Sequence, residues 1–376
     1  MLNRIKAIAK KEVRQLKRDK RMLYVLFVFP ILLLVIFGYA INFDVHHIKM
    51  VIFDRDKSTD SRNFVKSLTS SDYFDLVGYI HSESQIKEVL DTKQAQCVVV
   101  FPQDFSKEIY SRQTAPLQIL IDGVDANSAS IIISYMNAAT ASYSQKIQSS
   151  VLAVMGRKSY LPIDLRPAFW FNPELNSTFF LIPGLIAMIL IITAVVSISL
   201  SIVREKERGT IEQINVSPLT SFELLIGKTI PYTVIALMIA AFILAAGYVL
   251  FGITIKGNII LLFFSTLLFL FATLNLGILV SSIADTQQVA FQIATLVSML
   301  PSMLLSGYIF PIESMPPVVQ ILSNITPAKF FLIILRALLL KGAGIEAFWP
   351  QLIYLFIFSM IMLSLSSLIN MKSKTA

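Results

Sequence analysis

The chain has 376 residues, of which 55% are hydrophobic and only 15% carry a charge, whereas about 25% are charged in a typical soluble domain. Several apolar runs are long enough to cross a bilayer, so the composition excludes a water-soluble globular protein. The net charge of +8 lies outside residues 44–172, which hold 13 Lys/Arg and 14 Asp/Glu. A basic excess beside the membrane indicates anionic lipid headgroups and membrane topology, and it argues against nucleic-acid binding.

The N-terminal segment, residues 1–21, contains nine Lys/Arg and two acidic residues. Ile5, Ile8, Val13 and Leu16 recur near helical spacing, which predicts a basic amphipathic helix on the inner membrane surface. The candidate membrane-surface residues are Lys10, Lys11, Arg14, Lys17 and Arg18. The alternative is a solvated arm that only sets the orientation of the chain in the membrane.

Residues 22–43 carry no charge and are long enough to form a first transmembrane helix. The nine preceding cations predict a cytoplasmic N-terminus. The apolar run is longer than the core of an ordinary signal peptide, so we expect an uncleaved anchor.

Residues 44–172 form a polar block the size of one domain. Short β-type runs lie near residues 49–53, 74–80, 96–101 and 117–121, and helical stretches lie near 58–69, 82–93, 104–112 and 126–155. This alternation predicts an α/β domain with a partly parallel sheet. Because the first span leaves the cytoplasm, the domain is expected to be extracytoplasmic. The single Cys97 excludes an intramolecular disulfide.

Residues 173–376 contain five further apolar runs, near 177–203, 229–251, 258–283, 288–309 and 347–369. The expected fold is therefore a polytopic α-helical membrane protein with six transmembrane helices and an extracytoplasmic α/β domain between the first and second. This topology places both termini in the cytoplasm. It also places the charged residues 204–228 there, as a loop between the second and third helices.

The loop of residues 204–228 shows two helical pieces. Residues 204–215 carry charges of alternating sign, which is typical of a solvated helix. Thr220-Ser221-Phe222-Glu223 matches a capping box, and Ser217-Pro218 supplies a turn before it.

Residues 310–346 are the least regular part of the chain. Four prolines punctuate the segment, and the apolar stretch 330–340 is too short to span a bilayer. We expect short helices that enter the outer leaflet as a re-entrant segment, with Pro311, Pro316 and Pro317 as the candidate outer gate. The alternative is a solvated outer loop.

Three sequence patterns resemble functional motifs, but none of them supports a nucleotide, metal or catalytic site. Gly227-Lys228-Thr229 looks like the end of a phosphate-binding loop, but position 222 is Phe where that motif needs glycine, so no nucleotide site is expected in this chain. His46-His47 is weak support for a metal, because adjacent residues do not share a face. Glu205 and Glu207 are interpreted as solvated helix charges, not as a catalytic acid–base pair.

Polar side chains within the expected spans have two interpretations. Asn275, Gln287, Gln288 and Gln292 could line a wet path, but hydrogen bonds between helices are the favoured interpretation. Met299, Met303 and Tyr308 could line an adaptable pocket or belong to the packed core.

One group of motifs extends over almost the whole chain. The residues are Arg204-Glu205-Lys206-Glu207-Arg208-Gly209-Thr210-Ile211-Glu212-Gln213, Ser217-Pro218-Leu219, Glu223-Leu224-Leu225-Ile226-Gly227-Lys228, Lys11-Glu12-Val13-Arg14-Gln15, Phe171-Asn172-Pro173-Glu174-Leu175 and Pro183-Gly184. Together they resemble type-2 ABC exporter permeases, and the long domain after the first span resembles the drug-efflux-like branch.

The resemblance implies a half-transporter that pairs with a second permease, as a homodimer or as a heterodimer with a paralogue. ATP and magnesium would be bound by separate ABC ATPase subunits, and this chain would bind no cofactor. The candidate ATPase-coupling residues are Glu205, Glu207, Arg208, Gly209, Thr210 and Glu212. Alternating charges would give a partner-specific contact.

The expected function is therefore export of a hydrophobic or amphipathic compound by a permease that is not itself an enzyme. The expected location is the bacterial inner membrane, with membrane lipids and a periplasmic adaptor as further candidate partners. The alternative is a membrane-anchored receptor or assembly factor whose outer domain binds a ligand. An intramembrane enzyme is disfavoured, because the spans carry no paired Asp, Ser–Lys or His–Glu set.

Overall fold

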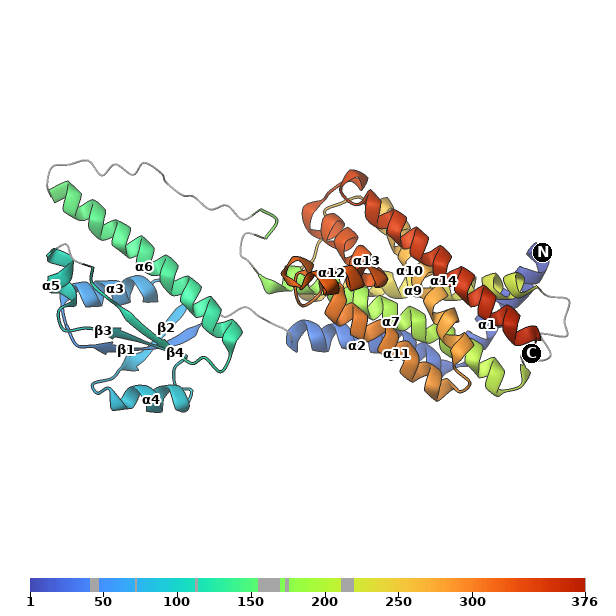
Figure 1. Ribbon diagram of the computed structural model, residues 1–376, viewed down its shortest axis with the longest axis horizontal. Coiled ribbons are helices and arrows are strands. Elements are labelled where there is room, and N and C mark those ends of the chain that lie inside the picture. Colours follow the sequence, from blue (N-terminus) through green and yellow to red (C-terminus); the bar gives the residue numbers. More distant parts are fainter. Residues whose placement is uncertain are drawn as a thin grey trace. The chain divides into compact units, whose positions relative to one another are not determined.

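A computed structural model describes residues 1–40, 47–71, 73–111, 114–154, 170–172, 176–210 and 220–375. The chain divides into two compact units. One comprises Met1–Asn42 with Ala168–Ala376, and the other comprises Phe43–Pro167. We call them the helical unit and the α/β unit and describe each by itself (Figure 1).

The α/β unit is built on a four-stranded sheet with the order β2-β1-β3-β4. The strands are β1 (Ile48–Asp54), β2 (Phe74–Tyr79), β3 (Cys97–Phe101) and β4 (Gln118–Ile121). Strand β1 pairs in parallel with β2 and with β3, whereas β4 is antiparallel to β3. The partly parallel sheet predicted from the sequence is thus present.

Helices cover both faces of this sheet. The helices are α3 (Thr59–Thr69), α4 (Ser84–Asp91), α5 (Phe105–Tyr110) and α6 (Ala126–Val154). Alternate residues of β1 point to opposite faces: Met50 packs with side chains of α3, α5 and α6, and Val51 packs with side chains of α4. Figure 1 shows α4 on one side of the sheet and α3 and α6 on the other. Both faces are therefore apolar, as expected for the inner strands of a covered sheet.

The chain's single cysteine reports on the integrity of this core. Cys97 in β3 has no exposed surface, and burial raises the pKa of its thiol to about 12. Because the thiolate is the reactive species, a maleimide should label native Cys97 about 100-fold more slowly than denatured protein. A Cys97→Ser/Ser70→Cys variant, with the thiol at an exposed position, is the matched control. Native labelling of Cys97 at the control's rate would contradict the described packing.

The helical unit is organised around α7 (Ser177–Glu207), most of which is buried. Around it lie α1 (Leu2–Arg18), α2 (Lys20–Ala40), α9 (Ser221–Phe251), α10 (Ile259–Ile283), α11 (Gln287–Leu305) and α14 (Trp349–Thr375). Helix α7 contacts α2, α9, α10 and α11 directly. Its apolar side chains form the centre of the core.

Five of the described helices are long and apolar enough to cross a membrane. They are Ser177–Glu207, Glu223–Phe251, Ile259–Ile283, Gln287–Leu305 and Trp349–Ser366. The chain is thus a polytopic helical membrane protein, as predicted. In α2, which corresponds to the expected first span, the apolar part is Leu26–Tyr39, and residues 41–43 of that span lie outside the described residues. The count of six spans stays a prediction.

The segment expected to be re-entrant is broken into short helices. These are η1 (Ile312–Ser314), α12 (Pro317–Leu322), η2 (Ser323–Ile325), α13 (Pro327–Arg336), η3 (Ala337–Lys341) and η4 (Ile345–Ala347). Pro317–Ile325 and Pro327–Lys341 together form an apolar helix pair bent by 92°. Such a pair is either a broken span or a re-entrant loop.

Polar and aromatic side chains within the helices mostly serve packing. Asn275 of α10 donates to the hydroxyl of Ser359 in α14 at 3.0 Å, so it is a helix–helix contact, the interpretation favoured from sequence. Gln288 and Gln292 are exposed on α11. Tyr308 is buried, and its ring lies against Gly184, so it belongs to the packed core.

Candidate functional site

The N-terminal helix α1 packs on the start of α9. Its apolar residues Ile5, Ile8 and Leu16 are buried, and a Cβ atom placed on Gly227 of α9 would lie 2.8 Å from Cβ of Ile8. The amphipathic helix predicted from the sequence is present: Ile5, Ile8 and Leu16 of its predicted apolar stripe face protein, whereas Val13 is exposed. The candidate membrane-surface residues, Lys10, Lys11, Arg14, Lys17 and Arg18, are exposed on the rest of its surface. Their contact with lipid stays a prediction.

Beneath α1 lies a buried cluster of charges that joins three helices. Lys228 of α9 is 2.6 Å from a carboxylate oxygen of Glu205 in α7 and 3.1 Å from one of Glu12 in α1. Lys11 forms a second ion pair with Glu205. The exposed fractions are only 2% for Lys228, 2% for Glu12 and 5% for Glu205. Two cations thus neutralise two carboxylates, which is the condition for burying charges in an apolar surrounding.

A shell of polar contacts surrounds this charge cluster. Ser201 of α7 donates to Glu12 at 3.1 Å. One turn further along α7, Arg204 donates to Asp19, between α1 and α2, at 2.8 Å, and to Gln287 of α11 at 3.3 Å. The end of α7 is therefore tied to α1, α9 and α11 simultaneously.

The last residues of α7 also hold the turn between α10 and α11. The Lys206 ammonium donates to the carbonyl oxygens of Ser281 at 2.7 Å and Ala284 at 3.2 Å, where a cation complements the C-terminal end of α10. The Glu207 carboxylate accepts from the backbone N–H of Gln287 at 2.6 Å and from its side-chain amide. Displacing the end of α7 would disturb this turn.

The capping box predicted at Thr220 is confirmed at the start of α9. Thr220 accepts from the backbone N–H of Glu223 at 3.2 Å, and the Glu223 carboxylate accepts from the backbone N–H of Thr220 at 3.0 Å. That carboxylate also lies 3.7 Å from the guanidinium of Arg4 in α1. The same residue thus starts α9 and fixes α1 beside it.

The six candidate coupling residues fall into three groups. Glu205 is buried, so its interpretation as a solvated charge is wrong: α1 covers it and two lysines neutralise it. Glu207, Arg208 and Gly209 are exposed, and Thr210 donates to the backbone carbonyl of Glu205 at 3.2 Å. Glu212 lies among residues 211–219, outside the described part of the chain. Their coupling role stays a prediction.

Gly209 ends α7 with a φ of +68°. This left-handed conformation strains residues that carry a Cβ atom, so glycine is needed where the chain leaves the helix. We define the α7 tip as Glu207, Arg208, Gly209 and Thr210. It is the end of a firmly anchored helix, and all of its residues except Thr210 are exposed.

Two members of the charge cluster, Glu12 and Lys228, were not candidates from sequence. Glu12 follows Ile8 and precedes Leu16 at intervals of four residues, so it occupies a position on the apolar stripe of α1. Lys228 likewise lies on α9 between the buried residues Leu225 and Tyr232, and it is the charged residue on that face. A charge on an otherwise apolar helix face is the signal that could have identified both. The buried, ion-paired ammonium of Lys228 also distinguishes Gly227-Lys228-Thr229 from a phosphate-binding loop.

Histidines provide no metal site among the described residues. No group of three His, Cys, Asp or Glu side chains there could hold a metal ion. His47 lies 3.1 Å from Asp75, and His46 is outside the described part of the chain.

At the far end of α7, the candidate outer-gate prolines lie at breaks between short helices. Pro311 precedes η1, Pro316 precedes α12 and Pro317 is its first residue; all three are exposed. Behind them, Arg336 of α13 donates to the carbonyl oxygens of Phe180 and Gly307, at 3.0 Å each, and lies 4.0 Å from the Phe180 ring centroid. One half-buried cation thus fastens α13 to α7 and to the end of α11. Whether the prolines form a gate stays a prediction.

Comparison with known proteins identifies the family. A family model described as "ABC-2 family transporter protein" matches residues 20–368. The chain belongs to the ABC-2 transporter family. It is 33% identical over 352 residues to the probable multidrug ABC transporter permease YbhR of Escherichia coli K12, covering 94% of each chain.

Two further relatives agree with this assignment. The probable multidrug ABC transporter permease YbhS of E. coli K12 is 33% identical, covering 90% of this chain and 89% of that relative. The inner membrane transport permease YhhJ of E. coli K12 is 28% identical, covering 92% and 91%. This member of the ABC-2 family is accordingly a multi-pass inner membrane transport permease, not an enzyme. Permeases of this family work in dimeric assemblies with an ATPase partner.

Proposed function

We propose that this ABC-2 permease forms the path by which an exporter moves a hydrophobic or amphipathic compound. A separate ABC ATPase subunit would bind ATP and magnesium and drive the cycle. The word "multidrug" in the names of YbhR and YbhS supports this substrate class. A second permease would complete the path, and equal identity to two E. coli permeases is compatible with a homodimer or a paralogue heterodimer.

The observation that carries the proposal is the anchoring of the α7 tip. Glu205, Arg204 and Lys206 tie the end of α7 to α1, α9, α11 and the α10–α11 turn. An ATPase that moved the exposed tip would therefore move several helices as one rigid body. Glu207 and Arg208 would supply the charges for the contact, and Glu205 would hold the helix that presents them.

The same proposal assigns an orientation. The cations of α1 support this orientation by the positive-inside rule, with α1, the α7 tip and both termini in the cytoplasm. A first span at α2 would then place the α/β unit outside the cytoplasm, where substrate or a periplasmic adaptor could contact it. Residues 310–346, with Pro311, Pro316 and Pro317, would close the outer end of the path.

Arg208→Glu is the direct test of ATPase docking. Arg208 is exposed at the α7 tip, so reversing its charge should lower the amount of co-purifying ATPase about tenfold, the effect of roughly 1.4 kcal/mol, without altering membrane insertion. Lys87→Glu, an equal change of charge at an exposed position of the α/β unit, is the matched control. Undiminished ATPase recovery with Arg208→Glu would refute the proposed contact.

A further inference from the structure

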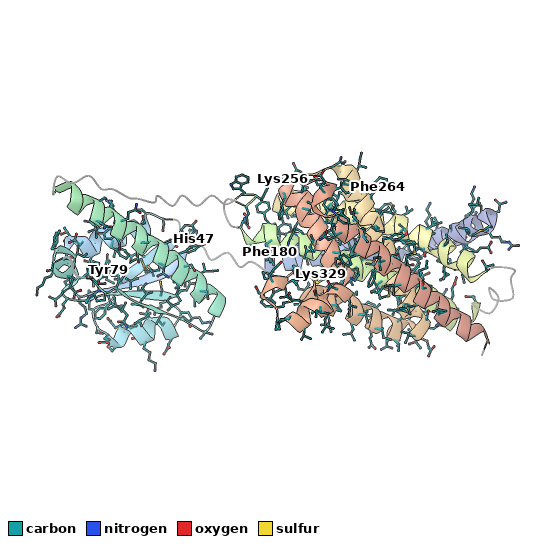
Figure 2. All side chains as sticks on the ribbon, turned by 45° about the horizontal axis from the view of Figure 1, so that its top comes forward. His47, Tyr79, Phe180, Lys256, Phe264 and Lys329 are labelled. Carbon is teal, nitrogen blue, oxygen red and sulfur yellow. The ribbon has the colours of Figure 1, made fainter. Side chains whose placement is uncertain are left out.

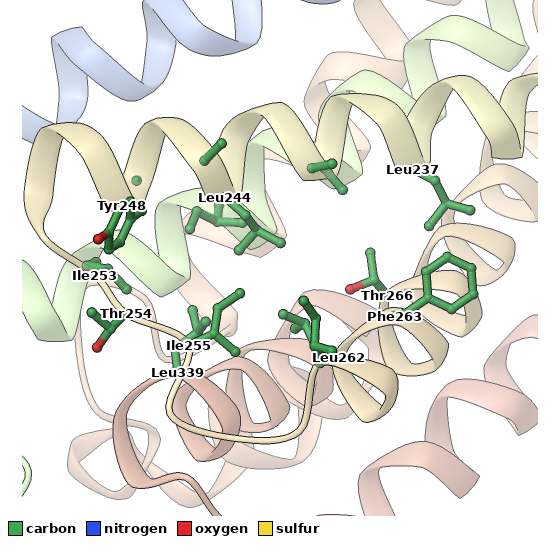
Figure 3. A pocket seen from close by; sticks show the side chains of 16 residues that line it. Leu237, Leu244, Tyr248, Ile253, Thr254, Ile255, Leu262, Phe263, Thr266 and Leu339 are labelled. Carbon is green, nitrogen blue, oxygen red and sulfur yellow. The ribbon is translucent and has the colours of Figure 1, made fainter.

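A groove of about 630 Å³ lies between α9, α10 and the loop that joins them. This volume falls within the range of about 300–1,000 Å³ that is usual for small-molecule sites. The groove is lined by the small residues Ala241, Ala245 and Gly247 of α9, which leave room for it. Its apolar walls include Leu244, Leu262 and Leu339. Figure 3 shows side chains of α9 and α10 facing each other across it. Only Tyr248, Thr254 and Thr266 contribute polar side chains, and no charged residue lines it.

Part of the groove lining is exposed at the surface of the helical unit. Tyr248, Ile259 and Phe263 on its rim are exposed. Helices α9 and α10, which carry them, are both long and apolar enough to span a membrane. Within a bilayer the neighbour of such a rim is lipid. Tyr248 lies one turn before the end of α9, the depth at which tyrosine is enriched in membrane proteins.

Two lysines belong to the loops that border the groove. Lys256 follows the lining residue Ile255, and Lys341 ends η3, which contains Leu339. A Cβ atom placed on Gly342 would lie 3.1 Å from the carbonyl oxygen of Lys256, and Gly257 donates to the carbonyl of Leu338 at 2.8 Å. The two loops are thus in contact. Both lysines are exposed, and no acidic side chain among the described residues forms an ion pair with either.

This pair of cations stands at the end of the helical unit opposite α1. Helix α9 runs about 46 Å between the two ends, and Figure 2 shows Lys256 toward the same end as Phe180. The N-terminus of α10, where Asn258 caps the helix, adds a partial positive charge there. These loops therefore favour an anion beside an apolar groove.

We propose that this groove binds an anionic phospholipid, with one acyl chain between α9 and α10 and the headgroup phosphate at Lys256 and Lys341. The apolar walls match the chain and the lysines match the phosphate. A second copy of this chain fits less well, because two-fold symmetry would bring the same lysines of both copies toward each other. The site is separate from the charge cluster and does not require that the exported compound be a lipid.

Photo-activatable lipids test the site in the full-length protein. Phosphatidylglycerol and phosphatidylcholine analogues with a diazirine in the acyl chain would be added to protein in nanodiscs, and labelled peptides located by mass spectrometry. The phosphatidylglycerol probe should label α9 and α10 at the groove above the level on the exposed face of α14, which reports bulk lipid. Lys256→Gln and Lys341→Gln should each lower its advantage over phosphatidylcholine about fivefold.

A substitution that fills the groove provides a second test of the lipid site. Ala245→Phe should reduce labelling of α9 and α10 to the bulk-lipid level, whereas Val249→Phe, on an exposed position of α9 that does not line the groove, should not. Thermal unfolding and ATPase recovery of both variants establish that they are folded, so failure of the lipid site is distinguishable from failure of ATPase docking. Groove labelling equal to bulk lipid, equal labelling of Ala245→Phe and wild type, or no preference for the anionic probe would overturn the proposal. High-yield crosslinking between copies through Ala245→Cys, in a Cys97→Ser background, would overturn it in favour of a dimer contact.

Discussion

Lys228→Met is expected to lower the free energy of unfolding of the helical unit by about 3–5 kcal/mol, because it leaves two buried carboxylates without their shared cation. Methionine preserves most of the volume, so the loss would come from charge. Glu12 and Glu205 are each at most 5% exposed and cannot recover the energy by hydration. The apparent melting temperature in mild detergent, followed by intrinsic fluorescence, would measure the effect.

A double variant separates charge from packing in this experiment. Glu12→Gln combined with Lys228→Met should recover part of the lost stability, because Lys11 still neutralises Glu205. Lys17→Met, the same substitution on the exposed side of α1, should change stability by less than about 0.5 kcal/mol. If Lys228→Met had the same melting temperature as the Lys17→Met control, the charge cluster would not hold α1, α7 and α9 together.

Gly277→Ala is expected to force α10 away from α7. A Cβ atom at position 277 would lie 2.6 Å from the carbonyl oxygen of Val195 and 2.3 Å from Cγ2 of Ile198. The side chain could rotate away, but the carbonyl belongs to the backbone of the central helix. The cost should therefore reach the upper part of the range of about 1–3 kcal/mol seen for overpacked cores, and Gly277→Leu should abolish the folded state.

Another glycine of the same unit is the control for this prediction. Gly344 has no atom within 4 Å of the position that a Cβ would take. Gly344→Ala should therefore match wild type in yield, size-exclusion profile and melting temperature. Equal behaviour of Gly277→Ala and Gly344→Ala would show that α7 and α10 do not approach as closely as described.

The sequence pattern predicts much of the fold because each signal is local. Apolar runs of about 20 residues predict the spans, and alternation of short strands with helices predicts the partly parallel sheet. The capping box of Thr220 and Glu223 involves residues three apart, so it is visible without tertiary information. Asn275 illustrates a correct preference whose partner, Ser359, only the structure identifies.

The charge cluster could not be predicted in the same way. Glu12, Glu205 and Lys228 lie in three separate segments of the sequence. A charge on an apolar helix face could mark Glu12 and Lys228, but nothing local shows that they meet Glu205. Their burial follows from the crossing of α1 over the ends of α7 and α9, which the local pattern does not specify. The same holds for Arg336, whose carbonyl partners Phe180 and Gly307 belong to two other segments.

Purification of this permease from its native membrane in mild detergent tests the proposed function most directly. The co-purifying proteins would be identified and ATP hydrolysis assayed. The proposed function predicts a stoichiometric ATP-binding subunit, and a second permease in the same preparation would distinguish a homodimer from a heterodimer. A pure, folded chain with neither an ATP-binding subunit nor ATPase activity would contradict it, and would favour a membrane-anchored receptor or assembly factor that acts through its α/β unit.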